Sequence, residues 1–263
     1  MDPRFLVAEL EKSARKVGRR LSAYLQNPDD EEGVHDVRTS LRRLEAAFSL
    51  MPKKARRKNH AQIKAYKDFF SANSRVRDYD IIREKLEGGA NARILTGVER
   101  KRKAELLRAL RLARAVQALP ALDVKKLDGK KLDARADTVA SRLLSSIKKR
   151  LLAALADRED KEELHELRKD LKKLRYVLEI LPASRKKKRH EAKLAGLVRA
   201  RSPVAARLKE LQDLIGSIHD CDIVIDYLKT VGGTAAAIRH KEIVERDVLF
   251  EKFAKIFSSS SSS

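Results

Sequence analysis

Two stretches of the sequence, 130 positions apart, carry the same pattern. Residues 34–52 read VHDVRTSLRRLEAAFSLMP, and residues 164–182 read LHELRKDLKKLRYVLEILP. They align without a gap and share a histidine, an arginine, a basic pair and a final proline at matching offsets. A match at a fixed shift indicates an internal duplication, with this pattern at the centre of each half.

A second match extends the duplication towards the end of each half. Residues 67–82 (KDFFSANSRVRDYDII) align with residues 209–224 (KELQDLIGSIHDCDIV) at a shift of 142. We place the 12 additional positions in the basic stretch RKKKRHEAKLAGLVRARSP before Lys209. The sequence therefore predicts a single domain, residues 1–257, made of two repeats at about 1–128 and 129–257. The serine run at 258–263 is of low complexity, and we expect it to be disordered.

The composition favours long helices and an all-α fold. The chain of 263 residues has only 10 glycines and 6 prolines, and it is rich in leucine, alanine and charged residues. Each half is predicted to form four helices followed or interrupted by a short helical piece. We place them near 4–26, 31–50, 60–73, 78–87 (short) and 92–119, and near 134–156, 161–181, 203–217, 220–229 (short) and 235–257.

The stretch at 34–52 predicts a helix with two neighbouring stripes. Its apolar side chains recur at spacings of three and four residues, the pattern of one buried helix face. His35, Arg38 and Arg42 follow the same spacing one position later, so they lie beside the apolar seam rather than opposite it. The second half repeats both stripes, and its basic stripe consists of His165, Arg168, Lys172 and Arg175.

A basic stripe in that position borders a region from which water is partly excluded. Like charges there repel one another and lose hydration, which is unfavourable unless carboxylates or a bound anion neutralise them. A single stripe of this kind is usually a solvated face or a set of salt bridges. Here both halves keep the stripe while positions such as Thr39 and Lys169 differ between them. We therefore interpret the stripes as an anion-binding surface.

The overall charge points to a polyanionic partner. Sixty lysines and arginines against 38 aspartates and glutamates give a formal net charge of +22. Such an excess favours nucleic acid, an anionic membrane surface or a phosphate polymer as the ligand. No segment reaches the roughly 18 apolar residues that span a bilayer, and the N-terminus makes a poor signal peptide. The lone Cys221 cannot form an internal disulfide, so we expect a cytoplasmic protein without membrane insertion.

Four further positions are weaker candidates. Lys67 and Lys209 match across the halves, which makes them candidates for the anion site. His60 and His190 lie inside basic runs that we interpret as solvated linkers, which add charge without ordered contacts.

The Asp-x-Asp motifs suggest a structural role. Asp78 and Asp220 follow Arg77 and His219, at the predicted start of the short helical piece in each half. We expect these carboxylates to cap that piece or to pair with an arginine, and metal ligation is the lesser alternative.

These motifs resemble those of the CHAD family, the conserved histidine α-helical domains. That family carries H-x-x-R-x-x-x-R-R-L-R in each of two repeats, followed by a motif similar to L-G-x-x-R-D-x-D. The matching segments here begin at His35 and His165, and the later motifs end at Asp80 and Asp222. The resemblance covers nearly all of the chain up to about Phe257.

The resemblance implies two four-helix bundles related by a pseudo-two-fold axis, with a central basic groove or pore that binds inorganic polyphosphate. It also implies association with polyphosphate granules or polyphosphate sensing. This chain departs from the family pattern by a lysine pair in the second half, by Ser74 at the glycine position and by His219 at an arginine position. The implied polyphosphate contacts, together with Arg175 from the stripe, are His35, Arg38, Arg42, Arg43, Lys67, His165, Arg168, Lys172, Lys173 and Lys209.

Three other functions fit parts of the sequence. A nucleic-acid binder fits the charge but not the low aromatic content of 5 %, since base stacking uses aromatic side chains. A phosphohydrolase fits the steps His35-Asp36 and His219-Asp220, but these lie at non-equivalent positions of the two halves. A scaffold for an acidic protein also fits the charge. We expect no catalysis, no cofactor and no metal, and the sequence leaves the oligomeric state open.

Overall fold

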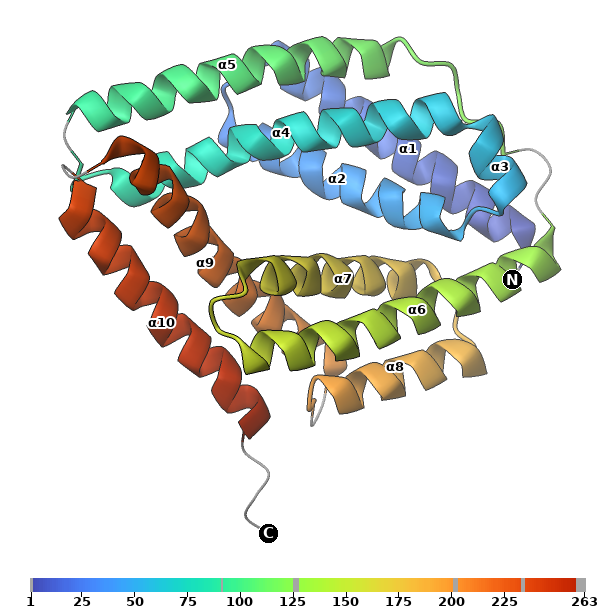
Figure 1. Cartoon of the computed structure of the whole chain (residues 1–263). Coiled ribbons are helices and arrows are strands. Elements are labelled where there is room, and N and C mark those ends of the chain that lie inside the picture. The colour runs from blue at the N-terminus through green and yellow to red at the C-terminus, as the bar shows by residue number, and fades with distance from the viewer. Residues whose placement is uncertain (1, 91, 125–127, 201–202, 233–234, 259–263) are drawn as a thin grey trace.

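The computed structural model describes residues 2–90, 92–124, 128–200, 203–232 and 235–258. Within these ranges the chain consists of α-helices and has no β-strand, which confirms the predicted all-α class (Figure 1). The first half contains α1 (Pro3–Gln26), α2 (Glu31–Leu50), α3 (Lys53–Lys58), α4 (His60–Leu86) and α5 (Ala92–Gln117). The second half contains α6 (Gly129–Ala156), α7 (Lys161–Ile180), α8 (Arg185–Leu197), α9 (Val204–Val231) and α10 (Ala236–Ser258).

The helices with the histidine motif, α2 and α7, begin with the same kind of cap. The carboxylate of Asp30 accepts hydrogen bonds from the backbone N–H groups of Glu32 and Gly33, each at 3.1 Å. The carboxylate of Asp160 accepts one from the N–H of Glu163 at 2.9 Å. Such caps satisfy N–H groups that have no partner inside the helix, and they fix where the histidine stripe starts.

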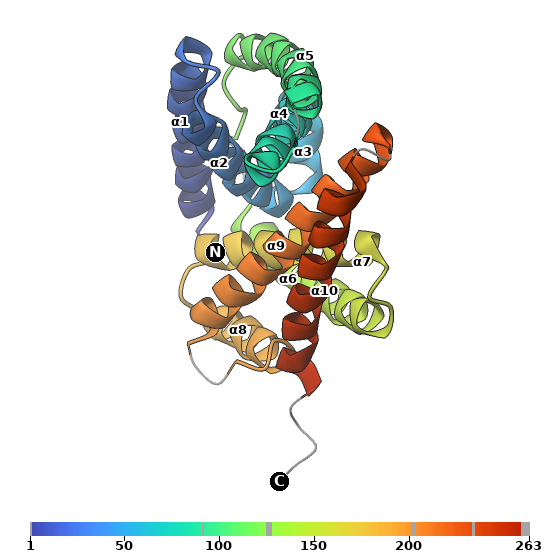
Figure 2. The same ribbon diagram turned by 90° about the vertical axis from the view of Figure 1, so that its left-hand side faces the viewer.

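The two halves repeat their pairs of neighbouring helices. In the first half α1 packs against α2 and α4 against α5, and in the second half α6 packs against α7 and α9 against α10. Figure 2 shows α5 lying above α4 and across from α1, whereas α10 runs along α9 at the edge of the molecule. The equivalence therefore holds for helix order and for these neighbours, and the pseudo-two-fold relation of two bundles stays a prediction.

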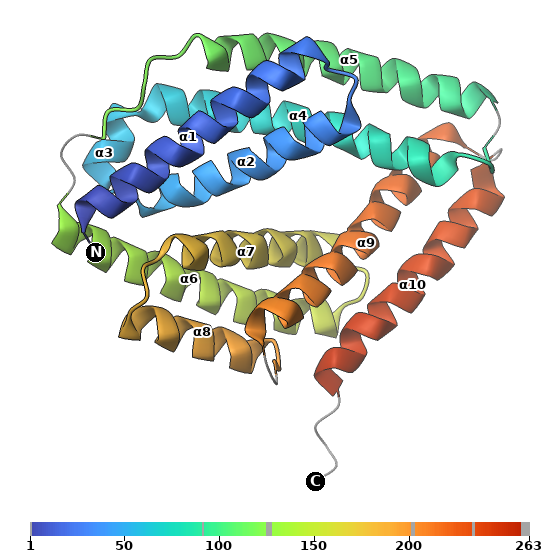
Figure 3. The same ribbon diagram turned by 180° about the vertical axis from the view of Figure 1, so that it is seen from behind.

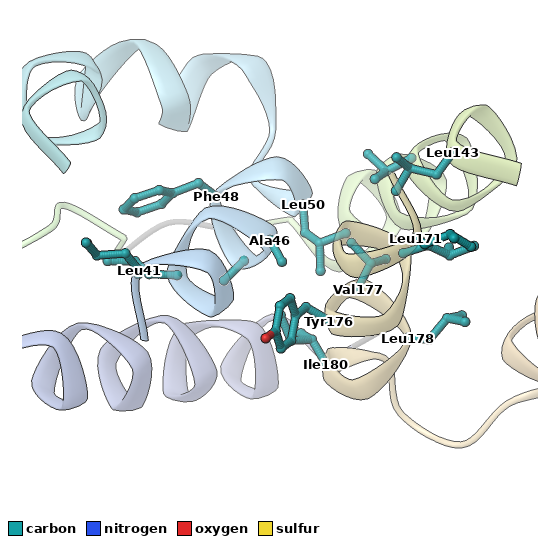
Figure 4. Packing of buried hydrophobic residues seen from close by; sticks show 14 of the residues in the cluster. Leu41, Ala46, Phe48, Leu50, Leu143, Leu171, Tyr176, Val177, Leu178 and Ile180 are labelled. Atoms are coloured by element: carbon teal, nitrogen blue, oxygen red, sulfur yellow. The ribbon is translucent and has the colours of Figure 1, made fainter. Parts of the chain in front are cut away.

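Contacts between the halves come mainly from the motif helices. α2 packs against α7, and α4 packs against α9 (Figure 3). Ala46 and Leu50 of α2 face Val177 and Tyr176 of α7, and all four side chains are buried (Figure 4). These side chains belong to an apolar cluster that includes residues of both halves. The apolar seam thus brings the basic stripes of α2 and α7 close to each other.

Two predictions about helix boundaries were wrong. α4 and α9 run without a break through the Asp-x-Asp motifs, so there are no separate short helices at 78–87 and 220–229. Asp78 and Asp220 therefore lie inside helices and cap nothing. The N–H groups of a helix interior already bond to the preceding turn, which leaves no orphan donor for a capping carboxylate.

The basic runs that we interpreted as solvated linkers are also helical. The first forms α3, and the second forms α8. His190 is 1 % exposed and its Nε2 lies 2.9 Å from the carboxylate of Asp137, so the linker interpretation is wrong for this residue. His60 is exposed, in agreement with a solvated position. Ser258 ends α10, and the rest of the predicted serine tail, 259–263, lies outside the described residues.

Candidate anion-binding site

A cavity of about 600 Å³ lies where α2, α4, α7 and α9 meet. The basic stripes of the two halves converge on it, since Arg38 and Arg42 come from α2 and Arg168 and Lys172 from α7. This is the convergence that an anion site shared by both halves requires. The lining residues are Arg38, Arg42, Glu45, Phe70, Ser71, Ser74, Asp78, His165, Glu166, Arg168, Lys169, Asp170, Lys172, Lys173, Tyr176 and His219.

The central basic side chains of this cavity form no direct ion pair, although carboxylates lie near them. Arg38, Arg42, Arg168 and Lys172 make no hydrogen bond or ion pair with another described residue. The Nε atoms of Arg38 and Arg168 are buried and unpartnered. A buried donor without an acceptor costs free energy that a bound anion can recover. The cavity thus presents basic side chains whose hydrogen-bonding capacity the protein itself does not satisfy.

The environment weakens the protonated forms of these cations. Burial, followed by repulsion from Arg168, Arg42 and Arg38, lowers the pKa of Lys172 to about 6. Burial and repulsion from Arg42 also lower the pKa of Arg38, to about 9, which still leaves its guanidinium charged at neutral pH. Such depressed values are typical of like charges gathered away from water.

Carboxylates line the cavity as well, but part of them is engaged elsewhere. Glu166 and Asp170 pair with Arg150 on α6, at 3.8 and 3.3 Å. Asp78 makes no ion pair within the described part of the chain, and burial raises its pKa, as does repulsion from Asp220. Asp78 and Asp220 attract the central cations without forming ion pairs with them, so these cations are neutralised only in part.

The histidines of the second half form a contact pair. The Nδ1 atoms of His165 and His219 lie 3.4 Å apart, and the ring centroids are 4.6 Å apart. Burial and repulsion from Arg168 lower the pKa of His219 to about 3, so its ring is neutral at physiological pH. The first half has His35 and Arg77 at the equivalent positions, and His35 is exposed. Neither His35 nor Arg77 lines the cavity, and Arg77 pairs with Glu31 at 3.5 Å, so the two histidine motifs do not contribute equally.

Comparison with known proteins agrees with this arrangement. The family model for the CHAD domain matches residues 8–229, which is most of the chain. The chain belongs to the CHAD family. Among solved structures, the crystal structure of the CHAD domain from the plant Ricinus communis is similar, with a TM-score of 0.58 and 18 % sequence identity. The similarity covers 99 % of this chain and 93 % of the plant chain, and at this identity it shows a shared fold. No curated protein matches significantly.

The other predicted ligand residues of this CHAD domain lie at or beyond the edge of the cavity. Arg43 of α2 and Arg175 of α7 both lie over the ring of Tyr176 and both reach Glu179, at 3.8 and 3.6 Å. Arg43 and Arg175 thus take part in a second contact between the halves, and Glu179 partly neutralises their charge. Lys67 and Lys209 are exposed and do not line the cavity, although Lys67 lies one helical turn before Ser71, which does.

The Asp-x-Asp motif of the CHAD domain divides its two carboxylates between two tasks. Asp80 forms a buried ion pair with Arg102 of α5 at 2.6 Å, and Asp222 forms the same pair with Arg246 of α10 at 2.7 Å. The preceding carboxylate, Asp78 or Asp220, is instead in the electrostatic field of the cavity cations. The buried pairs were not predicted, although the matching of both aspartates and both arginines across the halves was a usable signal.

The aromatic side chains of the cavity were also missed. The guanidinium carbon of Arg42 lies 5.4 Å from the ring centroid of Phe70, within the range of a cation–π contact. Tyr176 provides the equivalent support for Arg175. Tyr176 lies four positions after Lys172, so its place beside the basic stripe was recoverable from helical spacing. The contact of Phe70 with Arg42 depends instead on the packing of α4 against α2.

The remaining cluster of potential metal ligands is satisfied by a lysine. Cys221, Glu242 and Glu245 bring their ligand atoms within 4.8 Å of one another. The ammonium of Lys85 lies 3.3 Å from Glu242 and 2.8 Å from Glu245, so it already occupies the position of a cation. This cluster is an ion-pair network between α4 and α10.

No helix in the described part of the chain is both long and apolar enough to cross a bilayer.

Proposed function

We propose that this CHAD domain binds inorganic polyphosphate in the cavity between its two halves. The observation that supports the proposal is the group of basic side chains Arg38, Arg42, Arg168 and Lys172, which both halves supply and which form no ion pair with another described residue. Phosphate oxygens accept several hydrogen bonds each, and guanidinium groups donate two in parallel. A phosphate chain in the cavity provides acceptors for the buried Nε atoms and balances the mutual repulsion of the cations.

The proposed mechanism is capture without chemistry. A polyphosphate chain carries about one negative charge per unit and a layer of condensed counterions, which lysine and arginine displace as on nucleic acids. The release of these ions favours binding, and it makes affinity fall as the salt concentration rises. We propose a cytoplasmic protein that associates with polyphosphate granules or senses polyphosphate, with no catalytic step.

A titration with polyphosphate over a series of salt concentrations tests this function. We expect binding at low micromolar concentration or tighter in moderate salt, and weaker binding as salt increases. The double variant Arg38→Met/Arg168→Met keeps the packing of the long side chains but removes both guanidinium groups. Its affinity is expected to fall about a hundredfold, with the fold checked by circular dichroism.

The matched control is Lys148→Met/Lys149→Met, which removes the same charge from exposed positions of α6 that line none of the cavities described. Absence of polyphosphate binding at low salt, or equal affinity of the two double variants, would overturn the proposal.

Two further measurements separate the alternatives. Short polyphosphate should displace DNA or RNA from the protein far more readily than nucleic acid displaces polyphosphate. Phosphate release from polyphosphate in the presence of Mg²⁺ or Mn²⁺ would contradict a role in binding alone.

A further inference from the structure

A second basic groove lies next to the central cavity, between α4 and α5. It has a volume of about 560 Å³ and is lined by residues of both helices. These two helices run side by side (Figures 1 and 2). Four cationic side chains and one carboxylate line it, so its lining has a net positive charge. The lining residues are Lys64, Asp68, Ser71, Arg75, Arg108, Arg111 and Leu112.

The groove and the central cavity adjoin at Ser71, which is exposed and lines both. On α4, Phe70 and Ser74 line the cavity. The next residue after each of them, Ser71 and Arg75, lines the groove. Stripes offset by one residue are neighbours on a helix surface, separated by about 100°. The exposed Lys67 lies one turn before Ser71, on the same part of the helix. A linear anion can therefore pass from one hollow to the other without crossing an apolar surface.

Two arginines on the α5 side of the groove lack counter-ions. Arg108 and Arg111 are exposed, and neither forms an ion pair with another described residue. By contrast, the α4 side is partly neutralised, because Lys64 pairs with Asp68 and Arg75 pairs with Glu105 at 3.0 Å. The free positive charge of the groove thus comes from α5.

In the second half, the positions on α9 equivalent to the α4 side of the groove are less basic. With the shift of 142 positions, Lys64, Ser71 and Arg75 correspond to Ala206, Asp213 and Ser217. Asp213 is exposed, so a carboxylate stands where Ser71 joins the two hollows in the first half. After the glycine pairs 88–89 and 232–233 the shift becomes 144, so Lys252 and Lys255 of α10 correspond to Arg108 and Arg111 of α5 and keep their charge. On α9, however, the positions equivalent to Lys64 and Arg75 are no longer cationic. The way out of the cavity along α4 is therefore more basic than the equivalent way along α9.

We propose that the α4–α5 groove is a second polyphosphate subsite, which holds the part of a long chain that extends out of the central cavity over Ser71. This inference rests on the proposed function, because it assigns the path of the same ligand. A long chain then occupies both hollows, and Arg108 and Arg111 bind the part of it that lies in the groove. A short chain occupies the central cavity alone. The chain leaves by the first half, so binding has a direction despite the duplication.

The test compares two ligands on one variant, Arg108→Ser/Arg111→Ser. We expect its affinity for long-chain polyphosphate to fall about tenfold, and its affinity for tripolyphosphate to stay at the native value. The slope of log affinity against log salt for the long chain should decrease by about 1 to 2, because two ionic contacts are lost. Both arginines are exposed, so the fold is not at risk.

The control is Lys148→Ser/Lys149→Ser, which reduces the net charge equally at a distance from the groove. A long-chain affinity of Arg108→Ser/Arg111→Ser equal to that of this control would overturn the second subsite, as would equal losses for both ligands. Failure of the central site has a different signature, since native protein would then bind neither ligand. The Arg38→Met/Arg168→Met variant should weaken both ligands.

Discussion

Lys172 is the residue whose charge depends most on whether the central cavity is filled. Arg168 of its own helix, Arg38 and Arg42 of α2 and Asp220 of α9 are the charged groups that act on it. With the pKa lowered to about 6, its amine is mostly neutral in the free protein at neutral pH. Phosphate oxygens nearby favour the ammonium form and raise this pKa.

Binding of polyphosphate near neutral pH should therefore take up protons, to which Lys172 contributes up to about one. Affinity is expected to decrease as the pH rises above about 6, because the proton must then come from solution. Calorimetric titrations in two buffers of different ionisation enthalpy measure the uptake. Lys172→Met should lower it relative to the native protein, and identical uptake in both would contradict this assignment.

The same residue contributes to the stability of the free protein with a defined sign. The folded pKa of about 6 lies below the ordinary value of 10.5, so the unfolded chain binds more protons between these values. The free energy of unfolding therefore decreases as the pH falls from about 10.5 to about 6. The cavity gains binding capacity at the expense of stability, as is common for functional sites.

At the scale of the elements, α4 and α9 each interact with the next helix through one motif carboxylate and with the central cavity through the other. One carboxylate of the Asp-x-Asp motif pairs with an arginine of the next helix, and the carboxylate two positions earlier acts on the cavity. The two lie 200° apart around the helix, which explains how neighbouring residues of one type can hold different roles.

The isosteric pair Asp80→Asn and Asp78→Asn separates these roles. Asp80 is 0 % exposed and its partner Arg102 5 %, so Asp80→Asn leaves a buried guanidinium without its main counter-ion. We expect a loss of about 3 kcal/mol in the free energy of unfolding, measured by chemical denaturation.

Asp78→Asn removes a carboxylate that forms no ion pair, so the unfolding free energy should change little. Its affinity for polyphosphate should increase about threefold, because less negative charge opposes the ligand. Similar destabilisation by both substitutions would show that the two carboxylates do not divide their tasks in this way.

At the scale of the whole molecule, the net charge of +22 makes the compact state repel itself. A ligand that binds only the folded chain and neutralises this charge should stabilise it strongly. At a free concentration about 100 times Kd, the gain is about 2.7 kcal/mol, or a rise in Tm of about 5 °C or more. Thermal unfolding with and without polyphosphate measures this rise.

The rise in Tm should shrink as salt is added, and it should be largely absent in Arg38→Met/Arg168→Met. This double variant should also be more stable than the native protein in the absence of ligand, because repulsion in the cavity is relieved. A full Tm rise in the variant would place the ligand outside the central cavity.

The sequence by itself determined the helical class, the duplication and the cationic stripes. Hydrophobic spacing and matching offsets are local, so Arg38 and Arg168 could be assigned to the edge of an apolar seam before any contact was known. The caps at Asp30 and Asp160 follow equally from local chemistry.

Only the tertiary structure decided which of these charged side chains form no ion pair and which hollows are open to a ligand. Ion pairs such as Asp80 with Arg102, and the junction of the two hollows at Ser71, depend on how helices distant in sequence pack against each other. The role of the Asp-x-Asp motif in α4 has the same origin. Asp80 caps no helix there, and its partner Arg102 lies on another helix, α5. Periodicity fixes the face on which a side chain lies, and packing fixes what that face meets.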